Sequence, residues 1–252
     1  MSRFDGRTVV VTGAGGGMGR AEALALAAEG ASVLVTDIDL AAAESAAAEG
    51  GDRCRAHHLD VTDPDGWQEL ATALDGPLHG LVNNAGISFR AGIAETSVAD
   101  WHRVLEVNLS SVFYGMKFLY PALAPGASVV NVSSIAGMLG YFSATYGTTK
   151  WAVRGLSKVG SLELADRGVR VNSVHPGLVD TPLLHSGDPR FVEESLRSVP
   201  AGRLATPEEV ARAVAFLLSD DASYINGTEL VVDGGLVSGG TYHRITGALA
   251  DR

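Results

Sequence analysis

The chain has 252 residues, of which 46% are hydrophobic and 19% charged, and 29 acidic side chains outnumber 19 basic ones to give a formal net charge of −10. This composition is too apolar for a disordered chain. The excess of acidic side chains argues against a nucleic-acid partner. A membrane partner is not expected either, because the sequence lacks a run of ~18 apolar residues. The single cysteine, Cys54, excludes an intramolecular disulfide and favours a reducing, cytoplasmic location.

Short β-branched segments alternate with amphipathic segments along the first half of the chain. They predict strands at residues 8–12, 32–36, 54–59 and 80–82. The amphipathic segments predict one helix that stops at Gly30, an alanine-rich helix that stops at Gly50, and a third over residues 63–74. This alternation is typical of βαβ units that build a parallel sheet.

The second half continues the alternation with longer helices. Helices are expected over residues 98–123, 143–166 and 207–218, the last with Thr206 as its N-cap, and strands over 128–132, 169–174 and 229–232. We therefore predict one domain over residues 1–252, with a Rossmann-type, doubly wound parallel sheet of about seven strands and helices on both faces, in three α-β-α layers. Segment 178–205, which Gly187 and Pro189 interrupt, is expected to form a mobile lid, followed by a C-terminal tail at 236–252.

A glycine-rich loop joins the first strand to the first helix, with the sequence Thr-Gly-Ala-Gly-Gly-Gly-Met-Gly from Thr12 to Gly19. Glycine there permits positive φ and lets a pyrophosphate reach the free N–H groups of the helix N-terminus. Because the spacing departs from G-x-G-x-x-G, a glycine-rich connection without a ligand is the alternative.

Asp37 strengthens the nucleotide interpretation. It ends the second strand, 20 residues after Gly17, where a carboxylate can accept hydrogen bonds from the adenosine ribose. A carboxylate repels the 2′-phosphate of NADP, and no Lys or Arg lies within the loop or beside Asp37. We therefore expect NAD rather than NADP; a solvated strand end or a helix N-cap is the alternative role for Asp37.

Tyr146 and Lys150 are four residues apart on a predicted helix and share one face. A phenol has an ordinary pKa near ~10, and a neighbouring ammonium lowers it, which would make Tyr146 a general acid/base. Such a pair also occurs by chance in helices. Here it is accompanied by Asn108 and by three motifs that follow predicted strands: Asn83-Asn84-Ala85-Gly86, Asn131-Val132-Ser133-Ser134 and His175-Pro176-Gly177. Doubly wound sheets bind their ligands at these strand ends.

Taken together, these motifs resemble those of the short-chain dehydrogenase/reductase family over residues 4–236. The resemblance implies an NAD-dependent alcohol dehydrogenase or ketoreductase acting on CH–OH groups, with Tyr146 as the proton donor or acceptor. It further implies that Lys150 binds the nicotinamide ribose and lowers the tyrosine pKa, and that Asn108 holds a water linking this lysine to solvent. The implied cofactor contacts, besides Tyr146 and Lys150, are Gly13, Gly17, Met18, Gly19, Asp37, Asp60, Val61, Asn83, Ala85, Gly86, Pro176, Gly177, Val179 and Thr181.

The serine that orients the substrate oxygen can be assigned in two ways. The family usually has it thirteen residues before the tyrosine, which selects Ser133, whereas alignment on the preceding strand selects Ser134. We expect Ser134, because shortening the loop at 140–145 by one residue costs less than shifting the strand register, which would turn its side chains to the opposite face. Ser133 is the alternative.

The substrate is predicted from the residues near these motifs. They are bulky, apolar and uncharged, which suits a hydrophobic ketone or secondary alcohol, although ordinary core or interface packing is the alternative for each. They are Ile135, Met138, Leu139, Tyr141, Phe142, Leu178, Leu183, Leu184 and Phe191. Within the family, segments 146–158 and 171–177 are most similar to those of bacterial 3α,20β-hydroxysteroid dehydrogenases, so a hydroxysteroid is a candidate substrate.

Two other functions remain open. A 3-oxoacyl-thioester reductase of the fatty acid synthesis type usually uses NADP and a basic docking surface, against which Asp37 and the acidic charge argue. A non-catalytic dinucleotide-binding regulator would typically have lost Tyr146 or Lys150. The scattered histidines, with His57 and His58 on alternate faces of a strand, predict no metal site. Family members pack helices like 98–123 and 143–166 against a second subunit, so a homodimer or homotetramer is expected, with burial inside the monomer as the alternative.

Overall fold

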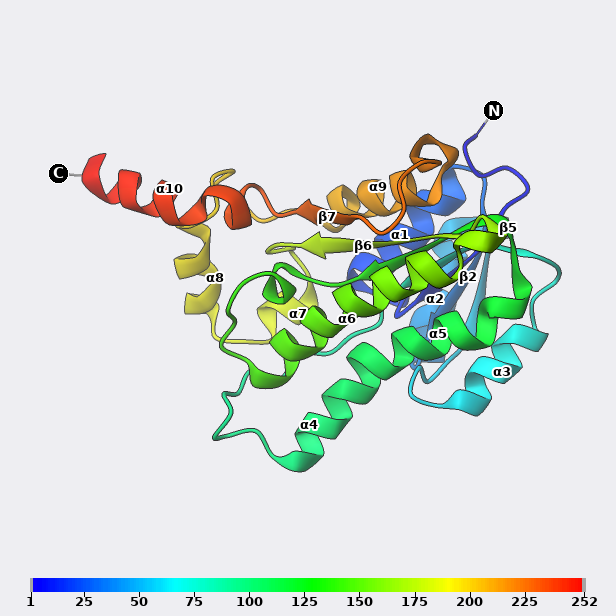
Figure 1. Ribbon diagram of the computed structural model, residues 1–252, viewed down its shortest axis with the longest axis horizontal. Coiled ribbons are helices and arrows are strands. Elements are labelled where there is room, and N and C mark those ends of the chain that lie inside the picture. Colours follow the sequence, from blue (N-terminus) through cyan, green and yellow to red (C-terminus); the bar gives the residue numbers. More distant parts are fainter. Residues whose placement is uncertain (1, 251–252) are drawn as a thin grey trace.

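A computed structural model describes residues 2–250, and within them seven strands form one sheet in the order β3-β2-β1-β4-β5-β6-β7 (Figure 1). All neighbouring strands pair in parallel. The strands are β1 (Thr8–Thr12), β2 (Ser32–Asp37), β3 (Cys54–His58), β4 (Leu78–Asn83), β5 (Leu123–Val132), β6 (Arg170–Pro176) and β7 (Glu229–Val232). The expected doubly wound parallel sheet is therefore confirmed.

Helices cover both faces of the sheet and give three layers (Figure 1). One face carries α1 (Gly17–Ala28), α2 (Leu40–Gly50) and α9 (Pro207–Leu218), and the other carries α3 (Pro64–Thr72), α5 (Ser111–Leu119) and α6 (Ala144–Glu163). The remaining helices are α4 (Val98–Leu105), α7 (Pro182–His185), α8 (Pro189–Leu196) and α10 (Leu236–Ala250). Short 3₁₀ turns lie at Gly51–Arg53, Tyr120–Ala122, Ile135–Gly137, Ala165–Arg167 and Asp220–Ala222.

The strands are buried on both faces, and alternate side chains enter different cores. Val9 and Val11 pack into the cluster under α1 and α9, whereas Val10 between them packs into the cluster under α3 and α5. This follows from the period of two along a strand. A sheet covered on both sides requires nearly continuous apolar runs, which explains the high content of β-branched residues.

The order of the strands reverses between β1 and β4, which are direct neighbours. The chain leaves β1 toward β2 on one side, while β4 leads to β5 on the other. A crevice opens at such a point outside the carboxyl ends of the strands. The glycine loop after β1 and residues 84–86 after β4 meet there.

The helix expected over residues 98–123 is interrupted. It consists of α4, a π-helical turn at Glu106–Ser110, and α5, and it ends at a 3₁₀ turn that contains Pro121. The π-turn includes Asn108, whose side chain bonds to the backbone of Ile87 rather than pointing to solvent. π-turns inside helices are frequent at functional sites, and the sequence carries no periodicity that would have predicted this one.

Segment 178–205 is more regular than expected. Pro189, which was expected to interrupt it, occupies the first turn of α8, and Pro182 occupies the first turn of α7; at these positions a missing N–H costs nothing. The side chains of Thr181 and Asp188 cap these helices. A parallel bridge between Val179 and Ala205 joins the two ends of the segment.

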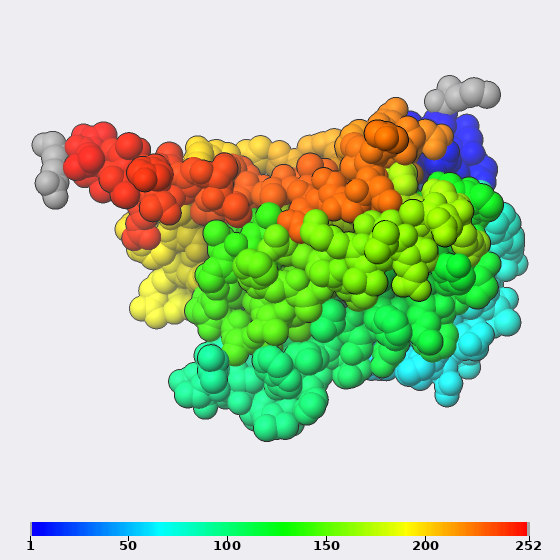
Figure 2. All heavy atoms as spheres, viewed as in Figure 1, coloured from blue at the N-terminus to red at the C-terminus, as the bar shows by residue number. Residues whose placement is uncertain are grey.

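The expected tail forms a helix, α10, up to Ala250; residues 251–252 lie outside the described part. Figures 1 and 2 show α10 standing away from the body of the molecule, beside α8. Arg244 on α10 lies 3.7 Å from Glu194 on α8. The tail therefore lies beside segment 178–205 and does not extend the sheet.

Candidate active site

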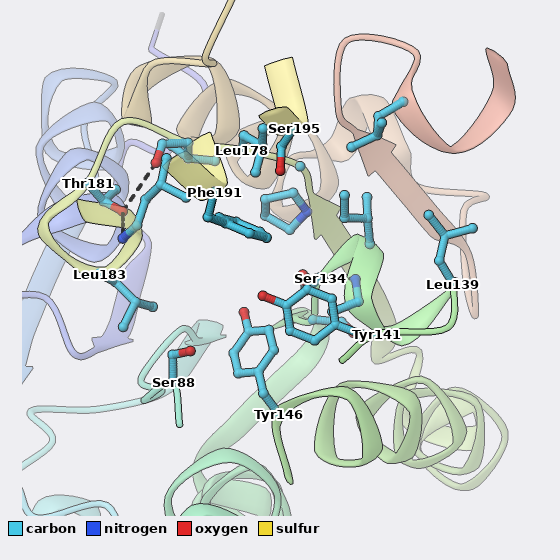
Figure 3. A pocket seen from close by; sticks show the side chains of 18 of the residues that line it. Ser88, Ser134, Leu139, Tyr141, Tyr146, Leu178, Thr181, Leu183, Phe191 and Ser195 are labelled. Carbon is cyan, nitrogen blue, oxygen red and sulfur yellow. Dashed lines mark hydrogen bonds between the residues drawn. The ribbon is translucent and has the colours of Figure 1, made fainter. Parts of the chain in front are cut away.

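Two neighbouring cavities open at the carboxyl edge of the sheet. We call the first the glycine-loop pocket; it is lined by Gly13, Gly16, Gly17, Met18, Asp37, Ile38, Leu59, Asp60, Val61, Asn84, Ala85, Gly86, Ile87, Val107, Thr181, Pro182 and Leu183. The second, the tyrosine pocket, contains Ser134, Tyr141 and Tyr146 together with residues of segment 178–205 (Figure 3). Met18, Thr181 and Leu183 line both cavities, so a ligand extending through the first would reach the second.

Glycines shape the first cavity by removing side chains. Gly13 has a φ of +62°, and a Cβ there would lie 2.9 Å from the Cα of Ala85, so β1 and β4 can approach closely at their ends. Gly19 does not line the cavity, although it was expected to contact the cofactor. A Cβ at Gly19 would lie 2.3 Å from the carbonyl oxygen of Gly13, so this glycine allows α1 to pack against the loop.

Asp37 is held at the edge of the glycine-loop pocket by two backbone donors. Its Oδ2 accepts a hydrogen bond from the N–H of Gly15 at 2.9 Å, and its Oδ1 accepts one from Asp39 at 3.0 Å. Asp60 and Val61 line the same cavity, and its described lining includes no Lys or Arg. The cavity thus presents carboxylates and backbone groups, without a basic side chain for a 2′-phosphate.

Ser133 and Ser134 have different surroundings at the end of β5. The hydroxyl of Ser133 donates to the backbone oxygen of Lys150 at 2.8 Å and so fastens the strand to α6. Ser134 faces Tyr146, and the hydrogen bond between them lowers the tyrosine pKa. Figure 3 shows the hydroxyls of Tyr146 and Tyr141 pointing into the cavity beside Ser134.

Lys150 is buried next to Tyr146, with its Nζ 5.7 Å from the centre of the tyrosine ring. Its ammonium donates to the backbone oxygen of Val132 at 2.9 Å, and burial lowers its pKa to about 8. Burial raises the pKa of Tyr146, while the Ser134 hydrogen bond and the charge of Arg90 act in the opposite direction. Desolvation outweighs these two effects, and a lowering of the tyrosine pKa by Lys150 stays a prediction.

Asn108 and Asn83 lie behind the cavities rather than in their walls. Oδ1 of Asn108 accepts from the N–H of Ile87 at 2.8 Å, and its Nδ2 donates to the Ile87 oxygen at 2.9 Å. A Cβ on Gly86 would lie 3.4 Å from Oδ1 of Asn108 and 3.6 Å from Nζ of Lys150, so both groups contact the same glycine. Asn83 donates to Oδ1 of Asn131 at 2.8 Å and links β4 to β5.

The walls of the tyrosine pocket agree with most of the predicted substrate residues. Eight of the nine line it; Met138 does not. Further lining residues are Met18, Ser88, Arg90, Ser133, Ser134, Ala136, Gly140, Tyr146, Pro176, Gly177, Val179, Thr181, Ser195 and Leu236. Pro176, Gly177, Val179 and Thr181, which were expected to contact the cofactor, thus line the same cavity as Tyr146.

Arg90 corrects the expectation of an uncharged pocket. Its guanidinium donates to the hydroxyl of Ser186 at 3.0 Å and to the backbone oxygen of Leu183 at 2.8 Å, and so connects the segment after β4 to segment 178–205. It lies in a coil without motif or periodicity, which is why the sequence did not indicate it. No role was predicted for His175, the first residue of the His-Pro-Gly motif. Its ring lies against the backbone of Ser134.

Residues 2–250 contain no cluster of three or more His, Cys, Asp or Glu side chains placed to hold a metal ion. Over the same residues, no helix is long and apolar enough to cross a bilayer.

Comparison with known proteins reveals relatives along almost the whole chain. A family model described as enoyl-(acyl carrier protein) reductase matches residues 13–237. Cyclohexanol dehydrogenase from an Acinetobacter species is 42% identical over 248 residues, which cover 94% of this chain and 97% of the relative. A 3-alpha-(or 20-beta)-hydroxysteroid dehydrogenase of Mycobacterium tuberculosis is 42% identical over 243 residues, covering 94% and 92%.

Solved structures give the same picture. A short-chain dehydrogenase/reductase from Brucella melitensis, described as a glucose/ribitol dehydrogenase, superposes with a TM-score of 0.89 at 38% identity and covers 93% of this chain and 98% of that one. The names of these relatives thus range from polyols to hydrophobic rings. Because one fold accommodates such different substrates, the substrate has to be inferred from the residues that line the pocket.

Proposed function

Because this chain belongs to the short-chain dehydrogenase/reductase family, we propose that it uses NAD(H) to interconvert a hydrophobic cyclic secondary alcohol and its ketone. The supporting observation is the tyrosine pocket, in which Tyr146 and Ser134 line a mainly apolar cavity. Two relatives at 42% identity are named for cyclohexanol and for hydroxysteroids. Aliphatic and aromatic walls suit such rings better than a sugar.

We assign the glycine-loop pocket to the dinucleotide. Its glycines leave space for a pyrophosphate against the N-terminus of α1, where backbone N–H groups and the helix dipole favour an anion. Asp37 would accept hydrogen bonds from the adenosine ribose, which supports NAD over NADP. Asp60 and Val61 would flank the adenine. Thr181, which lines both cavities, would lie at the nicotinamide end.

The bound dinucleotide would supply the acceptor or donor of hydride. In oxidation, the hydride leaves the carbinol carbon, and the deprotonated Tyr146 takes the hydroxyl proton, so that a ketone remains. In reduction, Tyr146 returns this proton to the carbonyl oxygen. Ser134 would hold the substrate oxygen through its hydroxyl and orient it toward Tyr146. Lys150 would bind the nicotinamide ribose and, with its positive charge, stabilise the tyrosinate.

Reduction of the ketone of a 3-oxoacyl thioester is the second candidate. The family model is described as an enoyl-(acyl carrier protein) reductase, a name that also refers to an acyl group carried as a thioester. An acidic carrier protein needs a basic docking surface, whereas this chain has a net charge of −10. Asp37 argues further against NADP. We therefore place this function second.

We also propose that the chain functions as one domain, in the cytoplasm, and as a homodimer or homotetramer. The single Cys54 supports the location. Exposed apolar side chains on α5 and α6 support the assembly.

Steady-state rates with NADH and NADPH on cyclohexanone, a 3-ketosteroid and an acetoacetyl thioester test the proposal. We expect turnover of a ring ketone with NADH. Preference for the thioester with NADPH would favour the second candidate. Tight NADH binding without turnover of any of a broad panel of ketones and alcohols would instead indicate a non-catalytic regulator.

A further inference from the structure

His175 is a buried histidine to which the chemistry above gives no role. It is the penultimate residue of β6, and its side chain is inaccessible to solvent. Its Nδ1 lies 3.2 Å from the backbone oxygen of Ser134, and its Nε2 lies 2.9 Å from the hydroxyl of Ser173. Both ring nitrogens thus have a hydrogen-bond partner. One of these partners is the backbone oxygen of Ser134, the residue that we propose orients the substrate oxygen.

The partners determine where the ring carries its proton. Burial lowers the pKa of His175, and this effect exceeds the opposing contributions of the Ser134 oxygen and of Glu229 on β7; the charges of Arg154 and Lys150 lower the pKa further. The ring is therefore neutral at pH 7 and has a single N–H. A carbonyl oxygen can only accept, so the proton lies on Nδ1 and the hydroxyl of Ser173 donates to Nε2.

The contact with Ser134 does not depend on this protonation state. In acid, Nε2 also carries a proton, and the Ser173 hydroxyl can then turn toward the backbone oxygen of Thr228, which lies 3.3 Å away. Nδ1 of His175 remains a donor in both forms. The ring can therefore donate to the Ser134 oxygen in both protonation states.

Ser134 stands at the start of a 3₁₀ turn, Ile135–Gly137, in an extended conformation. Its backbone oxygen accepts two hydrogen bonds: one from the N–H of Gly137 at 2.9 Å, within the same turn, and one from His175 on the neighbouring strand. The first maintains the shape of the turn. The second connects the turn to β6 and so sets the position of the serine relative to the sheet.

We propose that His175 is a positioning residue for Ser134: its Nδ1–H fixes the backbone oxygen of this serine, and thereby the direction of the serine hydroxyl toward the substrate oxygen and Tyr146. The proposal rests on the proposed function, because it takes Ser134 as the residue that orients the substrate. Displacing such a group by about 1 Å costs on the order of 100-fold in rate.

Two amide variants separate the roles of the two ring nitrogens. In His175→Asn the amide nitrogen can take the place of Nδ1 and still donate to Ser134, whereas in His175→Gln it takes the place of Nε2. We expect kcat for alcohol oxidation to stay near the wild-type value in His175→Asn and to fall by about 10- to 100-fold in His175→Gln. Ser173→Ala, which removes the partner of Nε2, is the matched control and is expected to behave like His175→Asn.

Two further readouts exclude a general loss of structure. NADH binding, followed by fluorescence, and the substrate KM are expected to change little in both His175 variants. The pH profile of oxidation is expected to move to higher pH in His175→Gln, because the Ser134 hydrogen bond that lowers the pKa of Tyr146 weakens. Equal losses of kcat in His175→Asn and His175→Gln, or an unchanged pH profile in the latter, would overturn the proposal.

A measurement without turnover tests the contact itself. ¹⁵N NMR of the histidine-labelled protein at neutral pH is expected to show a neutral ring with the proton on Nδ1, in the wild type and in Ser134→Ala, which keeps the backbone oxygen. A proton on Nε2 would refute the proposal even if the protein is an active dehydrogenase. If the Nδ1 tautomer is present but Ser134→Ala keeps full activity, the assignment of Ser134 is wrong, and the role of His175 in orienting it is refuted too.

Discussion

Oδ2 of Asp37 accepts a hydrogen bond from the backbone N–H of Gly15 at 2.9 Å. The end of β2 is thereby fastened to the glycine loop after β1, and the carboxylate cannot swing away from the cavity without losing this bond. A cofactor with a 2′-phosphate would have to place its negative charge beside a fixed one.

Asp37→Ala is expected to reduce the preference for NADH over NADPH. Two like charges about 4 Å apart near a protein surface repel by about 4 kcal/mol, so the ratio of kcat/KM values for the two cofactors should fall by at least about tenfold. Asp60→Asn is the matched control, because Asp60 lines the same cavity and its carboxylate bonds to Thr62 instead. An unchanged ratio in Asp37→Ala would contradict the role given to this residue.

Tyr146→Phe is expected to lower kcat by about 10³-fold, because general acid/base catalysis contributes on this scale, while NADH binding persists. Tyr141→Phe is the control: its ring lies 5.8 Å from that of Tyr146, and burial raises the pKa of Tyr141 to about 12, so it stays protonated. Comparable losses in the two variants would mean that the hydroxyls share a binding role.

The protonation state of Tyr146 determines how the rates of oxidation and reduction depend on pH. Oxidation needs the deprotonated form of Tyr146, and burial raises its pKa, so the oxidation rate should increase with pH through the neutral range. Reduction needs the protonated form and should show the opposite trend. Rates measured in both directions between pH 6 and about 10 test this; an oxidation rate that falls toward high pH, in protein that remains folded, would contradict it.

Arg90 is expected to hold the lid over the tyrosine pocket. Its hydrogen bonds reach Leu183 and Ser186, and a Cβ on Gly187 would lie 2.9 Å from the guanidinium. Charged hydrogen bonds of this kind are each worth about 1.5–3 kcal/mol, so Arg90→Met should lower kcat/KM for the ketone by about tenfold or more, mainly through KM. Ser186→Ala, which removes one partner, should have a smaller effect. An unchanged KM in Arg90→Met would show that the lid is held by its apolar contacts.

The sheet could be predicted from the sequence because its signals are local. Strands such as Thr8–Thr12 are short apolar runs between turn residues, and their carboxyl ends carry the polar motifs that meet in the two cavities. The choice of Ser134 over Ser133 also depended on a local argument, the strand register, and the structure has Ser134 facing Tyr146.

The residues that the sequence did not reveal act across large separations in the chain. Arg90 contacts Ser186, 96 residues away, and His175 contacts Ser134, 41 residues away. Neither contact leaves a periodic signal at either end. The π-turn at Asn108 was hidden for a related reason, since its side chain bonds to Ile87, outside the helix.

The burial of Glu22 predicts that the protein becomes less stable as the pH rises through neutral. It is buried in α1, neither carboxylate oxygen has a hydrogen-bond partner within residues 2–250, and burial raises its pKa to about 8. The pKa of Glu22 in the folded state lies above the ordinary value of 4.5. The contribution of Glu22 to the free energy of unfolding is therefore largest below pH 4.5 and is lost as the pH rises toward 8. The loss would reach up to about 4 kcal/mol.

Glu22→Gln has no titrating group at this position and is expected to unfold at higher urea concentration than the wild type at pH 8. The difference should shrink as the pH is lowered to 5. Glu44→Gln, an exposed substitution on α2, serves as the control and should follow the wild type. A constant difference between Glu22→Gln and the wild type at all pH values would exclude titration of Glu22 as the cause.

The exposed face of α5 and α6 is expected to be covered by a second copy of the chain. Val112, Met116 and Val153 are buried within the monomer, whereas Trp151 and Leu162 are 50% and 81% exposed. Large apolar groups left in water in this way are typical of an interface between subunits.

Leu162→Asp would place a charge in this interface, where burial without a partner is costly. We therefore expect the wild type to elute as a dimer or tetramer in size-exclusion chromatography with light scattering, and Leu162→Asp to shift toward a smaller species while remaining folded. Leu40→Asp is the control, since Leu40 is 42% exposed and begins α2, which covers the opposite face of the sheet. A monomeric wild type would refute the expected assembly. An oligomer that Leu162→Asp leaves intact and Leu40→Asp dissociates would move the interface from α5 and α6 to the face covered by α2.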